Sequence, residues 1–160
     1  MLYILIVIGI VLAESKIKKQ IDENRNLGDR EEILGGRIVL KKQYNRGMLL
    51  NFMEDGAEKV KIMSGVILGA LLLIFVIFLP KKNKKLFKLG LSLCLGGAIS
   101  NTADRMTKGH VVDYFSFNCT GLKHVVFNLA DMFLLFGSML MMVSSLFSHK
   151  DKSCTDKASE

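Results

Sequence analysis

Four apolar blocks, separated by charged or polar segments, dominate the pattern along the chain. A helix of about 20 predominantly apolar residues is long enough to cross the hydrocarbon core of a bilayer. The blocks therefore predict four transmembrane helices. These helices cover about residues 1–20, 63–80, 86–104 and 125–147.

The first block, Met1 to Ala13, spans only ~20 Å as a helix, which is short for a full crossing. We expect Ile17 and Ile21 to extend it while the nearby lysines snorkel toward water. No basic region precedes the block and no small-residue cleavage site follows it. An uncleaved helix is therefore favoured over a signal peptide.

The connection between the first two predicted helices, about residues 22–62, is too long to be a simple link. Its apolar run at Ile38, Val39 and Leu40 is typical of a β-strand. We predict a small extramembrane β-substructure there. Residues 148–160 are polar and are expected to form a disordered tail. The expected fold is thus a membrane all-α protein, a four-helix bundle within one domain covering 1–160.

Composition supports a membrane protein and excludes a small secreted protein that is stabilised by disulfide bonds. Half of the residues are hydrophobic, the mean hydropathy is +0.33, and three cysteines are too few for a disulfide framework. The net charge of +7 raises the possibility of nucleic-acid binding. However, many lysines crowd between the second and third apolar blocks, where a basic loop would lie against lipid headgroups. We therefore expect membrane lipid, and no nucleic acid, as a partner. Charge alone leaves the orientation open, because the first connection is also rich in Lys and Arg.

The candidate chemistry lies where the third helix leaves the membrane and the fourth enters it. Asn101 precedes Asp104 and Arg105 at the exit, and Asn128 precedes Asp131 at the entrance. Each Asn stands three residues before its Asp, so on a helix the pair would share a face. Two antiparallel neighbours would bring the acids to similar depth. A carboxylate inside a membrane is costly, which makes it a functional candidate.

Two facing carboxyl groups tend to share one proton, because both cannot readily ionise at short range. The ionised member can take a proton from water while the protonated member polarises a peptide carbonyl. This is the chemistry of aspartic proteases, and it requires no metal or cofactor. Asn101 and Asn128 would fix the orientation of the carboxyl groups by hydrogen bonds.

Structural interpretations remain open beside this one. Asp104 next to Arg105 is also typical of a charged helix end at the interface. Asp131 could have a purely structural role within its apolar helix. Asp113 is interpreted as a loop-ordering residue rather than a third catalytic acid. The histidines lack the spacing of a zinc protease, and no metal site is predicted.

Three motifs together resemble the bacterial lipoprotein signal peptidase (signal peptidase II) family. They are the Gly-Gly-Ala-x-x-Asn-x-x-Asp-Arg of 96–105, the Val-Val-Asp of 111–113 and the Phe-Asn-x-Ala-Asp of 127–131. The resemblance implies four transmembrane helices in a bacterial cytoplasmic (inner) membrane, with both termini cytoplasmic. It also implies that the first connection is an outward-facing β-cradle.

The resemblance further implies an aspartic endopeptidase that removes the signal peptide from diacylglyceryl-modified prolipoproteins, on the amino side of the lipidated cysteine. Asp104 and Asp131 match the family's catalytic pair. Asn101, Arg105 and Asn128 match polar residues that line its active site. The family is inhibited by the cyclic peptide globomycin, which occupies that site. Nothing in the sequence requires more than a monomer.

The N-terminal half departs from the family pattern at two places. The family's Asp-x-x-x-Lys appears as Glu14 with Lys18, which preserves an i,i+4 pair. Its Asn-x-Gly-x-x-Phe keeps Asn45 and Gly47, but the aromatic residue, Phe52, comes two positions late. We expect this change to affect substrate contact from the cradle rather than the chemistry.

Two other functions are compatible with parts of this pattern. One is a non-catalytic relative that binds lipidated peptides in the membrane without cutting them. The other is a small proton-coupled carrier that uses Asp131 as a relay. The carrier predicts helix breaks in both halves and leaves the paired Asn-x-x-Asp pattern unexplained.

Overall fold

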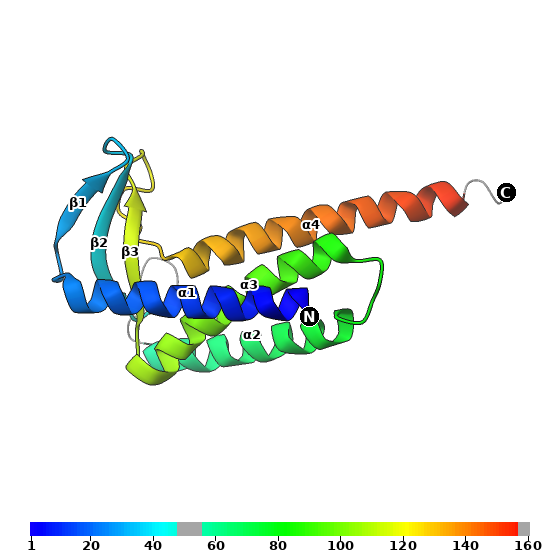
Figure 1. Cartoon of the computed structure of the whole chain (residues 1–160), viewed down its shortest axis with the longest axis horizontal. Coiled ribbons are helices and arrows are strands. Elements are labelled where there is room, and N and C mark those ends of the chain that lie inside the picture. Colours follow the sequence, from blue (N-terminus) through cyan, green and yellow to red (C-terminus); the bar gives the residue numbers. More distant parts are fainter. Residues whose placement is uncertain (48–55, 157–160) are drawn as a thin grey trace.

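The structure is a computed structural model that describes residues 1–47 and 56–156. Its described elements are four helices and a three-stranded sheet (Figure 1). The helices are α1 (Leu2–Asn24), α2 (Ala57–Phe78), α3 (Lys85–Lys108) and α4 (Leu129–Asp156). The strands are β1 (Arg30–Ile33), β2 (Ile38–Asn45) and β3 (Val111–Phe117).

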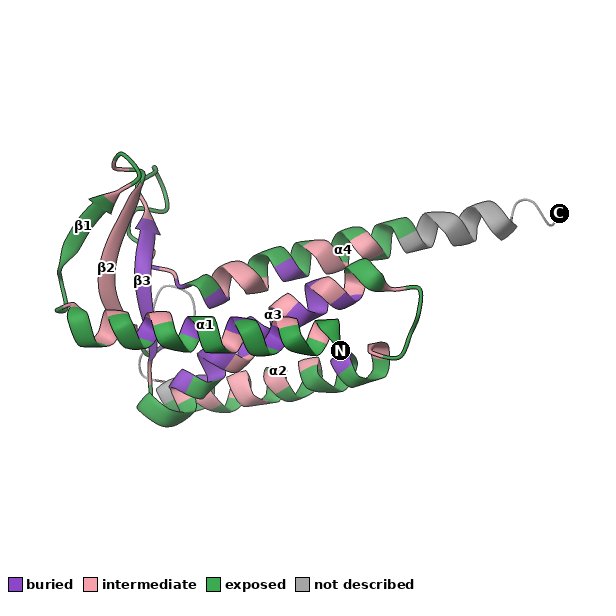
Figure 2. Ribbon diagram, viewed as in Figure 1, coloured by how far each residue is buried: buried purple, intermediate pink, exposed green. Residues whose placement is uncertain are grey.

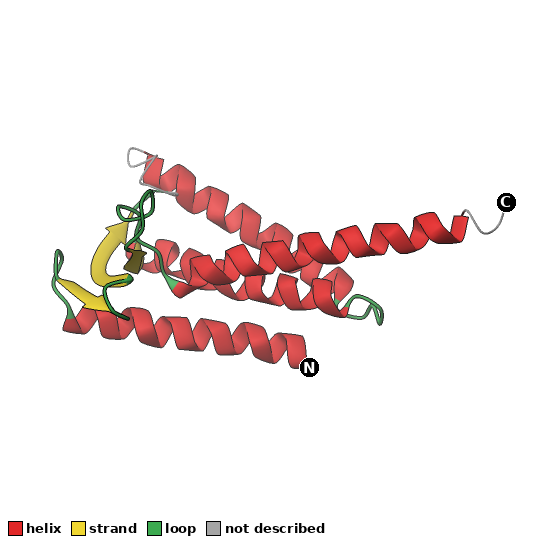
Figure 3. Cartoon of the chain, turned by 90° about the horizontal axis from the view of Figure 1, so that it is seen from above, coloured by secondary structure: helices red, strands yellow, loops and turns green. Residues whose placement is uncertain are grey.

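Helix α3 is the centre of the bundle and packs against each of the other three helices (Figures 1 and 3). Small residues permit this close packing. An added Cβ at Gly90 would lie 2.6 Å from the carbonyl oxygen of Gly137, and one at Gly97 would lie 2.5 Å from that of Ala130. Both contacts are with α4, so glycine sets how closely these two helices approach.

Helix ends follow local chemistry. Helix α2 ends two residues before Pro80, which cannot donate a backbone hydrogen bond to continue it. Helix α3 ends at Gly109, whose φ of 74° is the left-handed conformation that glycine adopts without strain. The chain then enters strand β3 directly. The helix boundaries differ from the predicted ones by one to nine residues, in part because polar turns at several helix ends remain helical.

The sheet is antiparallel in the order β1-β2-β3 and lies at the end of the bundle where α1 and α3 end and α2 and α4 begin (Figures 1 and 3). The predicted strand at Ile38 to Leu40 is confirmed by β2. Placing the whole β-substructure in residues 22–62 is wrong, because its third strand comes from after α3. Strand β3 pairs with β2 from Ile38↔Phe117 to Asn45↔Val111. Because β3 is distant from β2 in the chain, the sequence of the first connection gives no indication that a third strand pairs with it.

Strand β3 is also the buried strand of the sheet, in contrast to the exposed β1 (Figure 2). It lies against α1 and α3, and six consecutive residues from Val111 to Ser116 are buried. Burial of both faces explains why β3 lacks the alternating pattern of a half-exposed strand. The sheet is therefore anchored to the bundle through the segment that follows α3.

Among the described residues, two helical segments are long and apolar enough to cross a membrane. They are Glu58–Phe78 and Leu129–Phe147, with mean hydropathies of 2.6 and 1.8. Their outer faces carry exposed apolar side chains such as Val66, Val76 and Phe147. Helices α1 and α3 have similar lengths but contain buried charged and small polar residues, which lower their hydropathy. Their predicted crossings stay predictions.

Helix α4 continues to Asp156, beyond the predicted end at 147. The expectation that the polar tail is disordered from residue 148 is therefore wrong for most of that segment. A helix that is already formed extends at little cost, because only nucleation is strongly unfavourable. Residues 157–160 lie outside the described part of the chain.

Candidate active site

The last turns of α1 carry two charged side chains that are fully enclosed by the protein. Glu14 and Lys18 are each only 1% exposed. The expectation that the lysines near this helix end snorkel to water is wrong for Lys18. Its side chain points inward because it has buried polar partners on two sides, whereas Lys19, the next residue, is 74% exposed. The predicted i,i+4 pair between Glu14 and Lys18 is confirmed, with Nζ 3.8 Å from Oε1.

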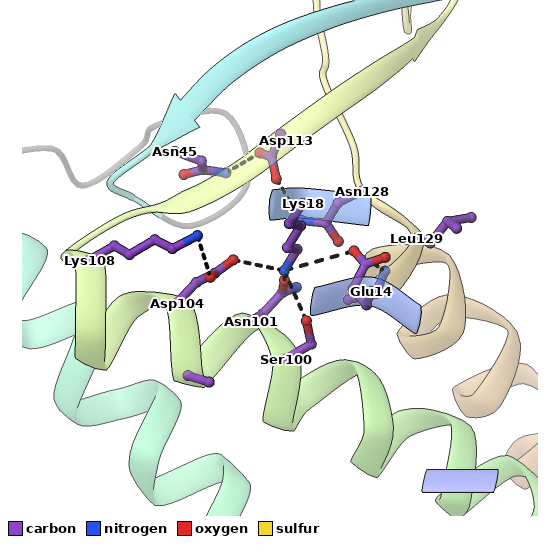
Figure 4. A network of polar contacts seen from close by, with 12 residues as sticks. Glu14, Lys18, Asn45, Ser100, Asn101, Asp104, Lys108, Asp113, Asn128 and Leu129 are labelled. Carbon is purple, nitrogen blue, oxygen red and sulfur yellow. Dashed lines mark hydrogen bonds and ion pairs between the residues drawn. The ribbon is translucent and has the colours of Figure 1, made fainter. Parts of the chain in front are cut away.

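Lys18 is the hub of a polar cluster on α3 (Figure 4). Its Nζ lies 3.0 Å from Oδ2 of Asp104 as an ion pair. It also donates hydrogen bonds to Oγ of Ser100 at 3.0 Å and to Oδ1 of Asn101 at 2.8 Å. A buried ammonium group requires such partners, because unpaired burial of a charge is very costly. One cation thus contacts three polar side chains of α3.

Asp131, on the first turn of α4, is tied to the same cluster through Asn101. The side-chain amide of Asn101 donates to Oδ1 of Asp131 at 2.9 Å while its carbonyl oxygen accepts from Lys18. Asp104 and Asp131 are therefore joined through Lys18 and Asn101. Asn101 therefore holds the carboxyl group of α4 rather than that of Asp104 on its own helix.

Asn128 and Asp131 form a reciprocal cap at the start of α4. The backbone N–H of Asp131 donates to Oδ1 of Asn128 at 3.0 Å, and the backbone N–H of Asn128 donates to Oδ2 of Asp131 at 3.1 Å. The prediction that this pair shares a helix face is wrong, because Asn128 precedes the helix. Asn is a preferred residue at that position, where its side chain satisfies a free N–H of the first turn.

The two remaining N–H groups of that turn are bound by residues from other elements. The N–H of Leu129 donates to the hydroxyl of Tyr114 at 3.0 Å, and the N–H of Ala130 donates to Oε1 of Glu14 at 3.2 Å. The Tyr114 hydroxyl in turn donates to Oε2 of Glu14 at 2.9 Å. Helix α1 and strand β3 together fix the turn that carries Asp131.

Asp113 is a buried third carboxyl group, contrary to the interpretation of a loop residue. It lies in strand β3 and is 1% exposed. Its oxygens accept hydrogen bonds from Nδ2 of Asn45 at 3.0 Å and from Nδ2 of Asn128 at 2.6 Å (Figure 4). Burial, with the nearby charge of Asp131, raises the pKa of Asp113 to about 7 against those two hydrogen bonds. Asn45 therefore acts on the cluster through Asp113.

Arg105 lies one turn beyond Asn101 on α3 and reaches the segment that follows β2. Its Nη2 donates to the carbonyl oxygen of Gly47 at 3.3 Å. This contact is the only one through which Gly47 meets the predicted site residues in the described structure. Lys108, at the end of α3, pairs with Oδ1 of Asp104 at 3.3 Å. Phe52, the displaced aromatic residue, lies outside the described residues.

A cavity of about 190 Å³ opens beside this cluster, between α2, α3 and α4. We call it the inner cavity. Polar side chains line one part of it and apolar side chains line the rest. A ligand could therefore place polar groups against the first part and apolar groups against the second. The polar lining residues are Asn45, Ser64, Asn101, Thr102, Arg105 and Asp131, and the apolar ones are Ile67, Ala98 and Leu134.

The structure thus brings together the predicted site residues on α3 and α4 and adds three that the motifs alone did not assign to the site. These are Lys18, Glu14 and Tyr114. Glu14 and Lys18 carried a signal in their i,i+4 spacing within an otherwise apolar helix. Tyr114 gave none, because an aromatic residue in a strand is most simply a packing residue. Among the described residues, no group of three His, Cys, Asp or Glu side chains is placed to hold a metal ion.

Comparison with known proteins identifies the family of the chain. The family model described as signal peptidase (SPase) II matches residues 6–147 of the chain. The chain belongs to the signal peptidase II family. The resemblance inferred from the three motifs is confirmed. Together with the two long apolar helices, the family identifies the chain as a membrane protein.

Named relatives within the family are similar over different lengths. The lipoprotein signal peptidase of Ralstonia nicotianae is 36% identical over 114 residues, 69% of this chain and 65% of the relative. The lipoprotein signal peptidase of Clostridium tetani is 29% identical over 141 residues, 88% of each chain. The match to the first relative therefore spans slightly less than two thirds of that protein.

Two solved structures share the fold. One, described as a bacterial membrane enzyme at 2.3 Å resolution, has a TM-score of 0.81 and 25% identity, covering 94% of this chain and 90% of its own. The other, a bacterial membrane enzyme at 1.9 Å resolution, has a TM-score of 0.77 and 26% identity, covering 90% and 92%. Both include the bundle and the sheet in a similarity that spans nearly the whole chain.

Proposed function

We propose that this protein is an aspartic endopeptidase that removes the signal peptide from diacylglyceryl-modified prolipoproteins, cutting on the amino side of the lipidated cysteine. The observation that carries the proposal is the joining of Asp104 and Asp131 through Lys18 and Asn101, beside a cavity. Membership of the signal peptidase II family and the names of the curated relatives support the substrate class.

The contacts of the two acids support different roles in hydrolysis. Asp104 pairs with two ammonium groups, those of Lys18 and Lys108. Asp131 accepts hydrogen bonds from neutral amides of Asn101 and Asn128. We assign Asp104 as the carboxylate that takes a proton from the attacking water. Asp131 is the acid that donates its proton to the scissile carbonyl as the diol forms. When the diol collapses, Asp104 passes the proton taken from the water to the leaving amine, and Asp131 takes a proton back from the diol, which restores both acids.

The remaining polar residues of the site position the acids or the substrate. Asn101 and Asn128 hold Asp131 by hydrogen bonds, and Asn45 acts through Asp113. Arg105 lines the inner cavity, where its guanidinium can bind a backbone carbonyl of the substrate. The hydrogen bond that it donates to the carbonyl oxygen of Gly47 holds the guanidinium in place. Globomycin-type inhibitors would occupy the same cavity.

A site inside the membrane matches the chemistry of the substrate. The diacylglyceryl chains can remain in lipid while the peptide bond reaches the acids, and moving those chains into water would cost about 0.8 kcal/mol per CH₂. We infer four membrane-spanning helices with both termini cytoplasmic, in a bacterial cytoplasmic membrane. The sheet would then lie at the outer surface, beside the ends of α1 and α3 and the starts of α2 and α4.

The test is a gel-shift assay on a diacylglyceryl-modified prolipoprotein, using the purified protein in lipid vesicles. The Asp104→Asn and Asp131→Asn variants preserve side-chain shape but remove the acid, and each should abolish processing. Asp29→Asn is the matched control, because Asp29 is exposed in the turn before β1. Its activity should equal that of the wild type, and unfolding temperatures should confirm that all variants fold.

Two outcomes would contradict the proposal. Processing at the normal rate by either folded acid variant would exclude a catalytic pair. Binding of the lipidated precursor by the wild type without cleavage would instead support a non-catalytic relative.

A further inference from the structure

A second cavity, of about 100 Å³, lies beyond the inner cavity, toward the end of the bundle that carries the sheet. We call it the cationic cavity. It is lined by Arg46 from the segment after β2, Glu58 and Lys61 from α2, and Arg105 and Gly109 from the end of α3. No residue assigned to the proposed chemistry lines it except Arg105.

The two cavities follow one another along the same face of α3. Ala98 and Asn101 line the inner cavity, Arg105 lines both cavities, and Gly109 lines the cationic one. These positions recur every three or four residues, so they lie above one another on the helix. From Ala98 to Gly109 the helix rises about 16 Å. That distance is enough for several residues of an extended peptide.

Helix α2 supplies the opposite wall in the same order. Ile67 and Ser64 line the inner cavity, and Lys61 and Glu58, nearer the start of the helix, line the cationic one. The lining therefore changes from apolar, through the polar cluster with Asp131, to charged. A peptide that crosses the inner cavity would have its apolar part on the side of Ile67 and its polar part on the side of Lys61.

The charges that line the cationic cavity are not balanced, although Arg105 is also attracted by Asp104, Asp113 and Asp131, which do not line it. Three cationic side chains face one acid, Glu58. Within the described part of the chain, neither Arg46 nor Lys61 forms an ion pair, and the guanidinium of Arg105 donates to a neutral carbonyl oxygen. Like charges gathered around one cavity repel each other, and an anion bound there would relieve the repulsion.

We propose that the cationic cavity is a subsite for an acidic side chain of the substrate, on the segment that follows the lipidated cysteine. This inference rests on the proposed function, because it takes Asp104 and Asp131 to mark the scissile bond. The signal peptide, which is apolar, occupies the part of the path near Ile67 and Ala98. The first residues of the mature protein extend past Arg105 toward Lys61 and Arg46.

The proposal predicts a charge preference at the residue immediately after the cysteine. Three diacylglyceryl-modified substrates that differ only there, with Asp, Asn or Lys, are compared by kcat/KM in phosphatidylcholine vesicles. We expect the Asp substrate to be cleaved about 10-fold more efficiently than the Lys substrate, with Asn between them. The difference should shrink at high salt, because the cavity is open to solvent.

The decisive variant is Lys61→Glu, which reverses one charge of the cavity without touching the residues assigned to catalysis. It should reduce or reverse the preference for Asp over Lys while leaving cleavage of the Asn substrate within about twofold. Lys59→Glu is the matched control. Lys59 is an exposed lysine on the same helix that lines neither described cavity, and its variant should keep the wild-type preference.

The outcomes separate this inference from the proposed function. Equal cleavage of all three substrates by the wild type overturns the subsite and leaves the peptidase intact. Cleavage of none overturns the proposed function and the subsite with it. Equal cleavage together with activation by phosphatidylglycerol that Lys61→Glu abolishes would assign the cavity to a lipid phosphate, and would also overturn the proposal.

Discussion

The end of α3 and the start of α4 each carry one of the two acids, but they hold it in different ways. Asp104 is held by the ammonium groups of Lys18 and Lys108. Asp131 is held by amide groups, one from Asn101 and one from the backbone of Asn128. Within one polar cluster, one carboxyl group thus has two cations as direct partners, and the other has neutral hydrogen-bond donors.

The difference shows how a site can give two identical side chains different tasks. A carboxylate beside fixed cations remains charged and can accept a proton, whereas one beside neutral donors depends on hydrogen bonds for its orientation. Changes on the Asp104 side should therefore act through charge. Changes on the Asp131 side should act through geometry.

The largest effect is expected for Lys18→Met, which removes the cation from the Asp104 side. Asp104 keeps Lys108, but buried Glu14 loses the cation paired with it, and breaking a buried ion pair costs about 3–5 kcal/mol. We expect processing to fall by at least about 100-fold on that basis. Initial rates of precursor cleavage in vesicles, with the unfolding temperature of each variant, measure this.

Lys19→Met is the control, because Lys19 neighbours Lys18 but is exposed, and it should retain full activity. The double variant Glu14→Gln with Lys18→Met removes a positive and a negative charge together. It should recover stability without recovering activity. Recovery of activity would show that Lys18 acts only as a structural residue.

Tyr114→Phe tests how the position of Asp131 affects catalysis, because it deletes only one hydroxyl group. That hydroxyl links Glu14 to the N–H of Leu129, at the start of the turn that carries Asp131. Loss of a hydrogen bond to a charged group corresponds to about a 10-fold change, which we expect in kcat with little change in KM. Steady-state kinetics on a lipidated peptide would measure both constants.

Tyr44→Phe is the matched control for this prediction. Its hydroxyl also donates to a carboxylate, that of Asp22, but it lies on the sheet away from Asp131. Hydrogen exchange should increase at Leu129 in Tyr114→Phe and stay unchanged in the control. A fall in kcat of equal size in both variants would contradict a positioning role for Tyr114.

Asp113→Asn tests the carboxyl group behind Asp131 through the pH dependence of stability. The pKa of Asp113 is raised from 3.8 to about 7, chiefly by burial. Between these values the folded protein keeps a proton that the unfolded chain releases, so the contribution of Asp113 to stability falls as pH rises. Asn does not titrate there. About 3 pKa units correspond to about 4 kcal/mol, so the wild-type Tm should fall relative to that of the variant by roughly 10 °C between pH 4 and pH 8.

The measurement is thermal unfolding of both proteins in the same detergent across that range. Other titrating groups are common to the two proteins and cancel in the difference. A constant difference in Tm would show that Asp113 ionises normally in the folded state.

The smallest effect is expected for Lys108→Ala. Lys108 is the more exposed of the two cations on Asp104, and a partly exposed ion pair contributes about 1 kcal/mol or less. We expect processing to fall less than threefold, with a larger fall at low salt. A loss of activity as large as that of Lys18→Met would mean that Lys18 and Lys108 contribute equally to holding Asp104.

The sequence predicted the helical bundle and identified Asp104 and Asp131 as candidate functional residues, because both features can be recognised within short stretches of the chain. Apolar blocks predict helices by length, and Asn-x-x-Asp patterns inside them are conspicuous because charged groups are costly there. The close approach of α3 and α4 was also predictable from Gly90 and Gly97.

The partners of the acids were not predictable, because they depend on which side chains meet from distant segments. Lys18 and Asn101 are far apart in the chain, and spacing cannot show that the lysine turns inward rather than toward water. Strand β3 joins a sheet whose other strands precede α2, so Asp113 resembled a loop residue. Asn128 matched the spacing of a helical pair but caps the helix instead.

Gly97 makes the structure sensitive to substitution at a position that carries no functional group. Its missing side chain lets the backbone of Ala130, the residue before Asp131, rest against α3, with only 2.5 Å left for a methyl group. A single carbon added at this chemically inert position would wedge the two helices apart and tilt one acid away from the other. A residue that takes no part in bond breaking therefore tolerates almost no added volume, and inherited variation should be scarcer there than at many of the polar positions around it.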